Sequence, residues 1–280
     1  MTDVAIRRGF VDIAEGQIHY RTCGPSNGPI LVMLHGSPLS SYSITSMMKE
    51  MGRVFRVIAP DMLGNGDSSP PTQLTVTFPY LADAMMRGME ALGLTQFFLY
   101  GFHTGGNLAI EAALARPKAV KRLIIEGVGL YSPEERTAML ANQAPEMKCD
   151  HEGTQLLRAW HLVRDGKYYW PWWNRTKEGA RSNGLPSPDN LHDQVVELLK
   201  AIRTYHHSYR ASFSYDKVSR MKLLRLPVLV SASESDPLHS HLEDAVSLIP
   251  GGRLAVAGDP STEEGQQKTA QAYTEFLLSK

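Results

Sequence analysis

Cysteine is scarce in this chain, and neither sign of charge is in excess. Two cysteines among 280 residues, Cys23 and Cys149, are too few for a disulfide framework and suit a reducing compartment, although a secreted protein with two thiols stays open. The 29 basic and 29 acidic side chains give a formal net charge of zero. The sequence therefore lacks the basic footprint that a nucleic-acid partner or an anionic membrane surface would require.

The sequence also lacks a long apolar run. No stretch approaches the roughly 18 apolar residues of a membrane span, and the opening residues MTDVAIRRGF contain no apolar core of a signal peptide. We therefore expect a soluble, cytoplasmic protein without a membrane partner. Hydrophobic residues make up 42% of the chain, which is enough for one large core with room for an inserted subdomain.

Short apolar runs recur along the chain and are typical of strands buried on both faces of a parallel sheet. They occupy residues 30–34, 54–59, 97–100, 120–125 and 228–232, with a weaker run at 253–256. Polar and apolar residues alternate at 9–13 and 18–20, which predicts an N-terminal β-hairpin. Helical patterns separate the runs at residues 80–92, 108–116, 242–248 and 264–278. This alternation predicts an α/β fold, a mostly parallel sheet with helices on both faces.

The alternation is interrupted between residues 131 and 221. Helical patterns occur there at 134–140, 154–163 and 191–205, and all four tryptophans fall between Trp160 and Trp173. The segment is interpreted as a helical insertion at 131–221 into a core formed by 1–130 and 222–280. The tryptophans form either the insertion's own small core or an apolar wall over a ligand pocket, since such pockets are mostly apolar and aromatic.

Three turn segments follow three of the predicted strands. They read LHGSP at 34–38, APDMLGNGDS at 59–68 and GFHTGG at 101–106, and SESDP at 233–237 follows a fourth strand after the insertion. In this order the segments resemble the α/β-hydrolase superfamily, and the resemblance extends from the hairpin to the last helix. It implies the α/β-hydrolase fold with an inserted helical cap.

The resemblance places His103 at the sharp turn between a strand and a helix, which lifts one side chain above the sheet. The superfamily usually has serine at this position, sometimes aspartate or cysteine. Its acid is matched by Asp236, but the loop at 257–263, where the superfamily has its histidine, contains none. An ordinary serine-hydrolase mechanism is therefore excluded at this turn. An alternative is that His103 was engineered in place of a serine. The absence of the superfamily's histidine from the loop at 257–263 argues against this alternative.

The oxyanion hole of the superfamily is matched at Ser37 and Thr104. Both would contribute backbone N–H groups, and one such donor is worth about a hundred- to a thousand-fold in rate. His35, which precedes Gly36 in the first loop, is expected to brace that loop.

His103 has three interpretations. As a general base beside an anion hole, it suits proton abstraction next to a carbonyl, cleavage of a C–C bond or activation of water. As a nucleophile it would carry an acyl group on its imidazole. In the third interpretation the site is degenerate, and the protein is a non-catalytic small-molecule binder or scaffold. His207 and His239 are candidate partners for His103, although surface or capping roles are commoner. Asp236 can also be interpreted as an ordinary turn residue before proline.

The prediction is a cofactor-free enzyme, hydrolase-like or C–C lyase-like, that acts on a small apolar or aromatic carbonyl or ester compound. Phe102, Tyr131 and Trp160 are the expected substrate-binding side chains. No cysteine and histidine cluster has metal-ligand spacing, so no metal is expected. A conventional esterase acting through another serine needs a Ser–His pair elsewhere in the pocket. A homodimer is an assembly that the sequence leaves open.

Overall fold

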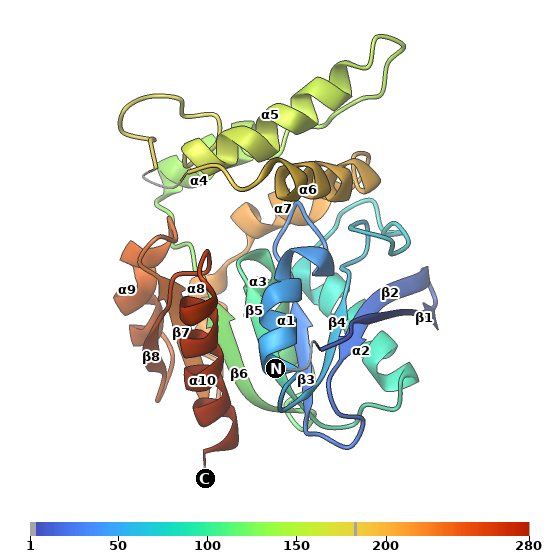
Figure 1. Cartoon of the computed structure of the whole chain (residues 1–280), viewed down its shortest axis with the longest axis vertical. Helices are drawn as coiled ribbons and strands as arrows, with labels where there is room; N and C mark the ends of the chain where they lie inside the picture. The colour runs from blue at the N-terminus through green and yellow to red at the C-terminus, as the bar shows by residue number, and fades with distance from the viewer. Residues whose placement is uncertain (1–3, 182–183, 280) are drawn as a thin grey trace.

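Eight strands form one sheet in the order β1-β2-β4-β3-β5-β6-β7-β8 in the computed structural model, which describes residues 4–181 and 184–279 (Figure 1). The first two strands form the antiparallel hairpin that the alternating pattern predicts, β2 pairs antiparallel with β4, and the remaining neighbours are parallel. The strands span Arg7–Ile13 (β1), Gly16–Cys23 (β2), Ile30–Leu34 (β3), Arg56–Pro60 (β4), Phe97–Phe102 (β5), Val120–Glu126 (β6), Val228–Ser233 (β7) and Arg253–Ala257 (β8).

Helices cover both faces of this sheet, and each face has its own apolar core. In Figure 1, α1 and α10 lie in front of the strands, and their buried side chains share one cluster with one face of β3, β4 and β5. The other cluster joins the opposite face to α2, α3 and α9. These helices span Thr45–Met51 (α1), Phe78–Ala91 (α2), Thr104–Ala115 (α3), Leu242–Ser247 (α9) and Glu263–Leu278 (α10). The predicted α/β class is confirmed, while the short α1 and the 3-10 turns Ser41–Ile44 (η1) and His239–His241 (η2) carried no recognised pattern.

Among the described residues, five helices come between β6 and β7, and α4 to α7 cross above the carboxyl ends of the central strands (Figure 1). Most of their buried side chains form a third apolar cluster, separate from the two clusters of the sheet. The helices span Pro133–Asn142 (α4), Thr154–Tyr168 (α5), Pro188–Lys200 (α6), Tyr205–Ser214 (α7) and Lys217–Met221 (α8). The helical insertion between strands is therefore present, and it covers the edge of the sheet where α/β folds bind ligands.

The helix predicted at 191–205 is wrong in its extent. The first helix ends at Lys200, and a second begins at Tyr205. The break contains Thr204, whose hydroxyl donates to the carbonyl of Gly64 at 2.6 Å and so ties this corner of the cap to the loop after β4. The hydrophobic periodicity of a helix cannot predict a break that depends on contact with a distant loop. In the part of the chain that the structure describes, no helix is both long and apolar enough to cross a membrane.

Candidate active site

His103 occupies the sharp turn between β5 and α3. Its backbone angles are φ 49° and ψ −111°, and it is the one non-glycine residue with positive φ in the described ranges 4–181 and 184–279. Such a conformation costs of order 1–3 kcal/mol and persists where the surroundings enforce it. Here the turn runs close to other backbone: a Cβ on Gly105 would lie 2.4 Å from the carbonyl oxygen of Leu34. Small residues on both sides therefore allow the turn.

Asp236, in the loop after β7, holds the imidazole of His103. Oδ2 of Asp236 lies 2.7 Å from Nε2 of His103, and Oδ1 accepts the backbone N–H of Leu238 at 2.8 Å. Burial raises the pKa of the Asp236 carboxyl, but the imidazole and these hydrogen bonds outweigh burial and leave the pKa below its usual value. Burial lowers the pKa of His103, but the Asp236 carboxylate outweighs it and leaves the pKa above its usual value. The carboxylate is thus ionised at neutral pH, and Nε2 carries the proton that it accepts.

The ring of His103 is also fixed on its faces and edges. The Phe102 ring stacks on it with centroids 4.1 Å apart and an interplanar angle of 22°. Gly127, after β6, approaches so closely that a Cβ there would lie 2.1 Å from Cδ2 of His103. The imidazole is 23% exposed, and no described residue forms a hydrogen bond with Nδ1. When the imidazole is neutral, this arrangement leaves Nδ1 free to accept a proton.

A partly buried acid that the sequence analysis did not single out lies under this turn. Glu126, the last residue of β6, accepts the backbone N–H of His103 through its carbonyl at 2.8 Å. Its side chain accepts the hydroxyls of Tyr100 and Tyr273 at 2.8 and 2.7 Å. Burial raises the pKa of the Glu126 carboxyl more than the two tyrosines lower it. The one signal in the sequence was an acidic residue directly after the apolar stretch 123–125.

Ser37, in the loop after β3, and Thr104, at the start of α3, both line the same cavity as His103. Ser37 follows β3, and its hydroxyl lies 2.9 Å from that of Ser208 in α7. Thr104 is the first residue of α3, where the unpaired backbone N–H groups and the helix dipole favour a negative charge. His35 joins two loops behind them: Nδ1 donates to the carbonyl of Gly36 at 3.1 Å and Nε2 accepts the N–H of Met62 at 3.0 Å.

The cavity above His103 has a volume of about 170 Å³ and lies between the sheet and the cap. Its walls are largely apolar and aromatic, and they include Tyr131, Leu162, Trp170, Trp172, Tyr209 and Phe213. Its polar lining includes Asn107, whose side-chain amide donates to the hydroxyl of Ser212 at 2.7 Å. None of the described serine hydroxyls is hydrogen-bonded to a histidine ring, so the arrangement holds no Ser–His pair of the conventional kind.

Four of the side chains that the sequence analysis expected to bind substrate or, as histidines, to partner His103 do not line this cavity. Trp160 is 36% exposed on the outer side of α5, whereas Trp170 and Trp172 reach the cavity instead. Phe102 lies against His103 and the core in front of the sheet rather than at the opening. His207 borders a different hollow with His206 and Arg210, and His239 begins η2 without reaching His103. Of the expected substrate-binding residues, Tyr131 alone lines the cavity.

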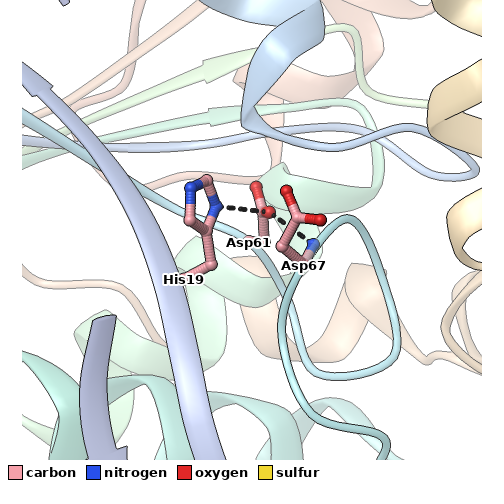
Figure 2. A group of neighbouring side chains, drawn as sticks. All are labelled: His19, Asp61 and Asp67. Carbon is pink, nitrogen blue, oxygen red and sulfur yellow. Dashed lines mark hydrogen bonds and ion pairs between the residues drawn. The ribbon is translucent and has the colours of Figure 1, made fainter. Parts of the chain in front are cut away.

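A separate group of possible ligand atoms comes from His19, Asp61 and Asp67 (Figure 2). One atom of each lies within 4.8 Å of the others. The Asp61 carboxylate already accepts Nδ1–H of His19 at 2.8 Å and the backbone N–H groups of Ser41 and Asp67 at 2.8 and 3.0 Å. Asp67 pairs with Lys200 at 3.0 Å. Hydrogen bonds therefore account for this group as an anchor of the loop after β4.

The order of strands, the turn at His103 and the inserted helices define the α/β hydrolase fold. The chain belongs to the α/β hydrolase fold family, whose pattern matches residues 29–259. It is 30% identical to a haloalkane dehalogenase of Mycobacterium marinum over 136 residues, and this segment covers 46% of each protein. It is 28% identical over 116 residues to carboxylesterase YbfK of Bacillus subtilis, which is 41% of this chain and 39% of the esterase. The chain thus spans under half the length of these relatives.

Solved structures extend the likeness to almost the whole chain. The carboxylesterase CesB (YbfK) of Bacillus subtilis superposes with a TM-score of 0.70 at 20% identity, covering 99% of this chain and 93% of the esterase. A putative lipase of Acinetobacter baumannii AYE gives a TM-score of 0.73 at 17% identity, covering 98% and 91%. At such identities the likeness shows the fold, cap included, and leaves the chemistry to the residues of the site.

Proposed function

We propose that this chain is a cofactor-free enzyme of the α/β hydrolase fold that hydrolyses a small apolar or aromatic carbonyl or ester compound, with His103 as general base. The observation that carries the proposal is the pairing of His103 with Asp236 at 2.7 Å, at the floor of a cavity with apolar walls. The likeness to esterases and to a haloalkane dehalogenase supports a hydrolytic reaction. The same base would also serve cleavage of a C–C bond next to a carbonyl.

In the proposed reaction, Nδ1 of His103 takes a proton from a water molecule while the water oxygen attacks the substrate carbonyl. The proton on Nε2 stays with His103, because Asp236 orients the ring and stabilises the imidazolium that forms. The backbone N–H groups of Ser37 and Thr104 would bind the oxyanion, at the N-terminus of α3. The imidazolium then returns its proton to the leaving oxygen, so that one water and one ester give an acid and an alcohol.

The decisive experiment compares the unaltered protein with His103→Ala and His103→Gln on a panel of small aromatic and aliphatic esters and β-diketones. We expect a loss of turnover by about a hundred- to ten-thousand-fold in both variants, since a positioned base contributes that much. Glutamine keeps the bulk of the side chain and removes the base, so equal losses would assign the effect to proton transfer. Turnover that survives in both variants would refute the proposal.

A covalent probe separates this reaction from that of a conventional esterase. Because no described serine pairs with a histidine, an organophosphonate should leave no adduct on a cavity serine in intact-mass measurements. An adduct on Ser37 or Ser212 would replace the proposed base mechanism with a serine nucleophile.

A further inference from the structure

Two lysines line the same cavity as His103 and have no part in the proposed reaction. Lys167 lies near the end of α5, and Lys217 is the first residue of α8. Lys217 is only 8% exposed, and Lys167 is half-buried. Among the residues that the structure describes, neither ammonium group forms a hydrogen bond or an ion pair. Lysine is almost never buried without a partner, because removing its charge from water costs several kcal/mol.

The charges around the two lysines do not neutralise them. Nζ of Lys217 lies 5.8 Å from the centre of the Tyr131 ring, a favourable cation–π distance, and its charged neighbour is Arg136. The charged neighbour of Lys167 is Arg181, whose guanidinium donates to the carbonyls of Gly166 and Ser235.

Asp236 lies near enough to Arg181 to offset part of the lowering of its pKa by burial, but the Asp236 carboxylate is bound to His103. The cavity of this formally neutral chain is therefore cationic on the side of the cap.

We propose that Lys167 and Lys217 form a carboxylate-binding subsite, and that the substrate carries a carboxylate separated from its reacting carbonyl by an apolar or aromatic body. This inference rests on the proposed function in one respect, because it assumes that the cavity above His103 is the substrate site. A carboxylate would supply the missing counter-charge, and Tyr131, Trp170 and Trp172 would contact the apolar body.

Both lysines also titrate in an accessible range. Burial first, and then the neighbouring arginine, lowers the pKa of Lys167 to about 8 and that of Lys217 to about 8. Both groups are therefore mainly cationic at pH 7 and lose their protons as the pH rises through about 8. Carboxylate binding favours the protonated forms and should weaken above that pH.

The test is direct binding without turnover, with benzoate as the probe and benzamide as its neutral counterpart. Quenching of intrinsic fluorescence reports occupancy, because Trp170 and Trp172 line the cavity. We expect benzoate to bind at least tenfold more tightly than benzamide at pH 7, and this preference to disappear by pH 9.5. Lys217→Met and Lys167→Met should each weaken benzoate at least fivefold and leave benzamide unchanged.

Two further variants control for loss of folding and for general charge. Lys217→Arg keeps the cation and should retain benzoate binding within about threefold. Lys118→Met removes an exposed lysine outside the cavity and should have no effect. Equal binding of benzoate and benzamide, or unchanged benzoate binding in both methionine variants, would overturn the subsite.

The outcomes for the subsite and for the proposed function are distinguishable. Charge-dependent benzoate binding in a protein that turns over no ester would leave the subsite standing and refute the hydrolytic function. If hydrolysis depends on His103 but does not change with either lysine variant or with a carboxylate on the substrate, the hydrolytic function stands and the subsite is refuted.

Discussion

Nε2 of His103 lies 2.7 Å from Oδ2 of Asp236, although 133 positions separate the two residues in the chain. The sheet brings them together because β5, β6 and β7 are neighbouring parallel strands whose carboxyl ends share one edge. This pair contains an imidazole that can accept a proton and a carboxylate that orients it, but no serine nucleophile. The pair therefore suits activation of a small molecule, such as water, more than formation of an acyl-enzyme.

Asp236→Asn should move the pH dependence of turnover as well as its magnitude. In the proposed mechanism His103 acts when its imidazole is deprotonated, so kcat/KM should rise with pH through a pKa above the usual value for histidine. Removing the carboxylate lowers that pKa, so the rising limb should shift to lower pH while the plateau falls by roughly ten- to a hundred-fold. A pH–rate profile measures both. Asp259→Asn, in the loop after β8, is the control, and a rising limb that stays in place would contradict the role of Asp236.

Gly127→Ala tests whether the close contact beside the imidazole matters. A Cβ there would lie 2.1 Å from Cδ2 and 2.4 Å from Nε2 of His103, so the ring must shift from the position in which Nε2 contacts Asp236. We expect kcat to fall by about a hundredfold, since a small misplacement of a catalytic group can cost that much. Gly93→Ala is the matched control, because Gly93 has φ 75° against 74° for Gly127 and no atom within 4 Å of the added Cβ. Equal activity of the two variants would show that the ring tolerates displacement.

Much of the fold was predictable because its strands are buried on both faces. Mostly apolar runs marked β3 to β7, and their alternation with helices predicted one parallel sheet. The positions of His103 and Asp236 followed, because each comes directly after such a run. Their separation of 2.7 Å did not follow, since strand order and loop shape decide which strand ends meet.

The cavity walls were harder to predict than the sheet. Exposed apolar residues blur the helical pattern of α5: Leu156 and Leu157 are 53% and 60% exposed, and Trp160 faces outward with them. Which face of a cap helix points to the cavity depends on contacts with other cap helices rather than on its own period. Glu126 was missed for a similar reason, because the tyrosines that hold its carboxylate come from β5 and α10.

We expect the ion pair between Glu111 and Arg220 to stabilise the contact between α3 and α8, at the end of the cap. The guanidinium donates to both carboxylate oxygens at 2.6 and 2.8 Å, Tyr215 donates a third hydrogen bond at 2.6 Å, and Glu111 is 3% exposed. Arg220→Met leaves that acid buried without its cation, so the free energy of unfolding should fall by about 3 kcal/mol. Urea denaturation measures the change.

Two controls separate the buried pair from an ordinary surface pair. Glu111→Gln combined with Arg220→Met should recover part of the lost stability, because no unpaired charge then remains inside. Arg116→Met breaks the surface pairs with Glu90 and Asp83, whose side chains are 51% and 50% exposed, and should cost at most about 1 kcal/mol. Equal effects of the two single variants would show that the buried position of Glu111 has no special cost.

Asp61 should make the fold sensitive to acid. Burial raises the pKa of this carboxyl, but the hydrogen bonds that it accepts from His19 and Ser41, together with the neighbouring imidazoles, outweigh burial and lower the pKa to about 2. The unfolded chain has the higher pKa, near 3.8, so the stabilisation is complete above that value and is lost as the pH falls toward about 2. Asp61→Asn should lower the free energy of unfolding at pH 7 by on the order of 2 kcal/mol and flatten its decline between pH 5 and pH 2. Urea midpoints measured across that pH range test this prediction. Glu264→Gln, at an exposed position, is the control. If Asp61→Asn loses stability between pH 5 and pH 2 as steeply as the unaltered protein, other carboxylates govern acid unfolding.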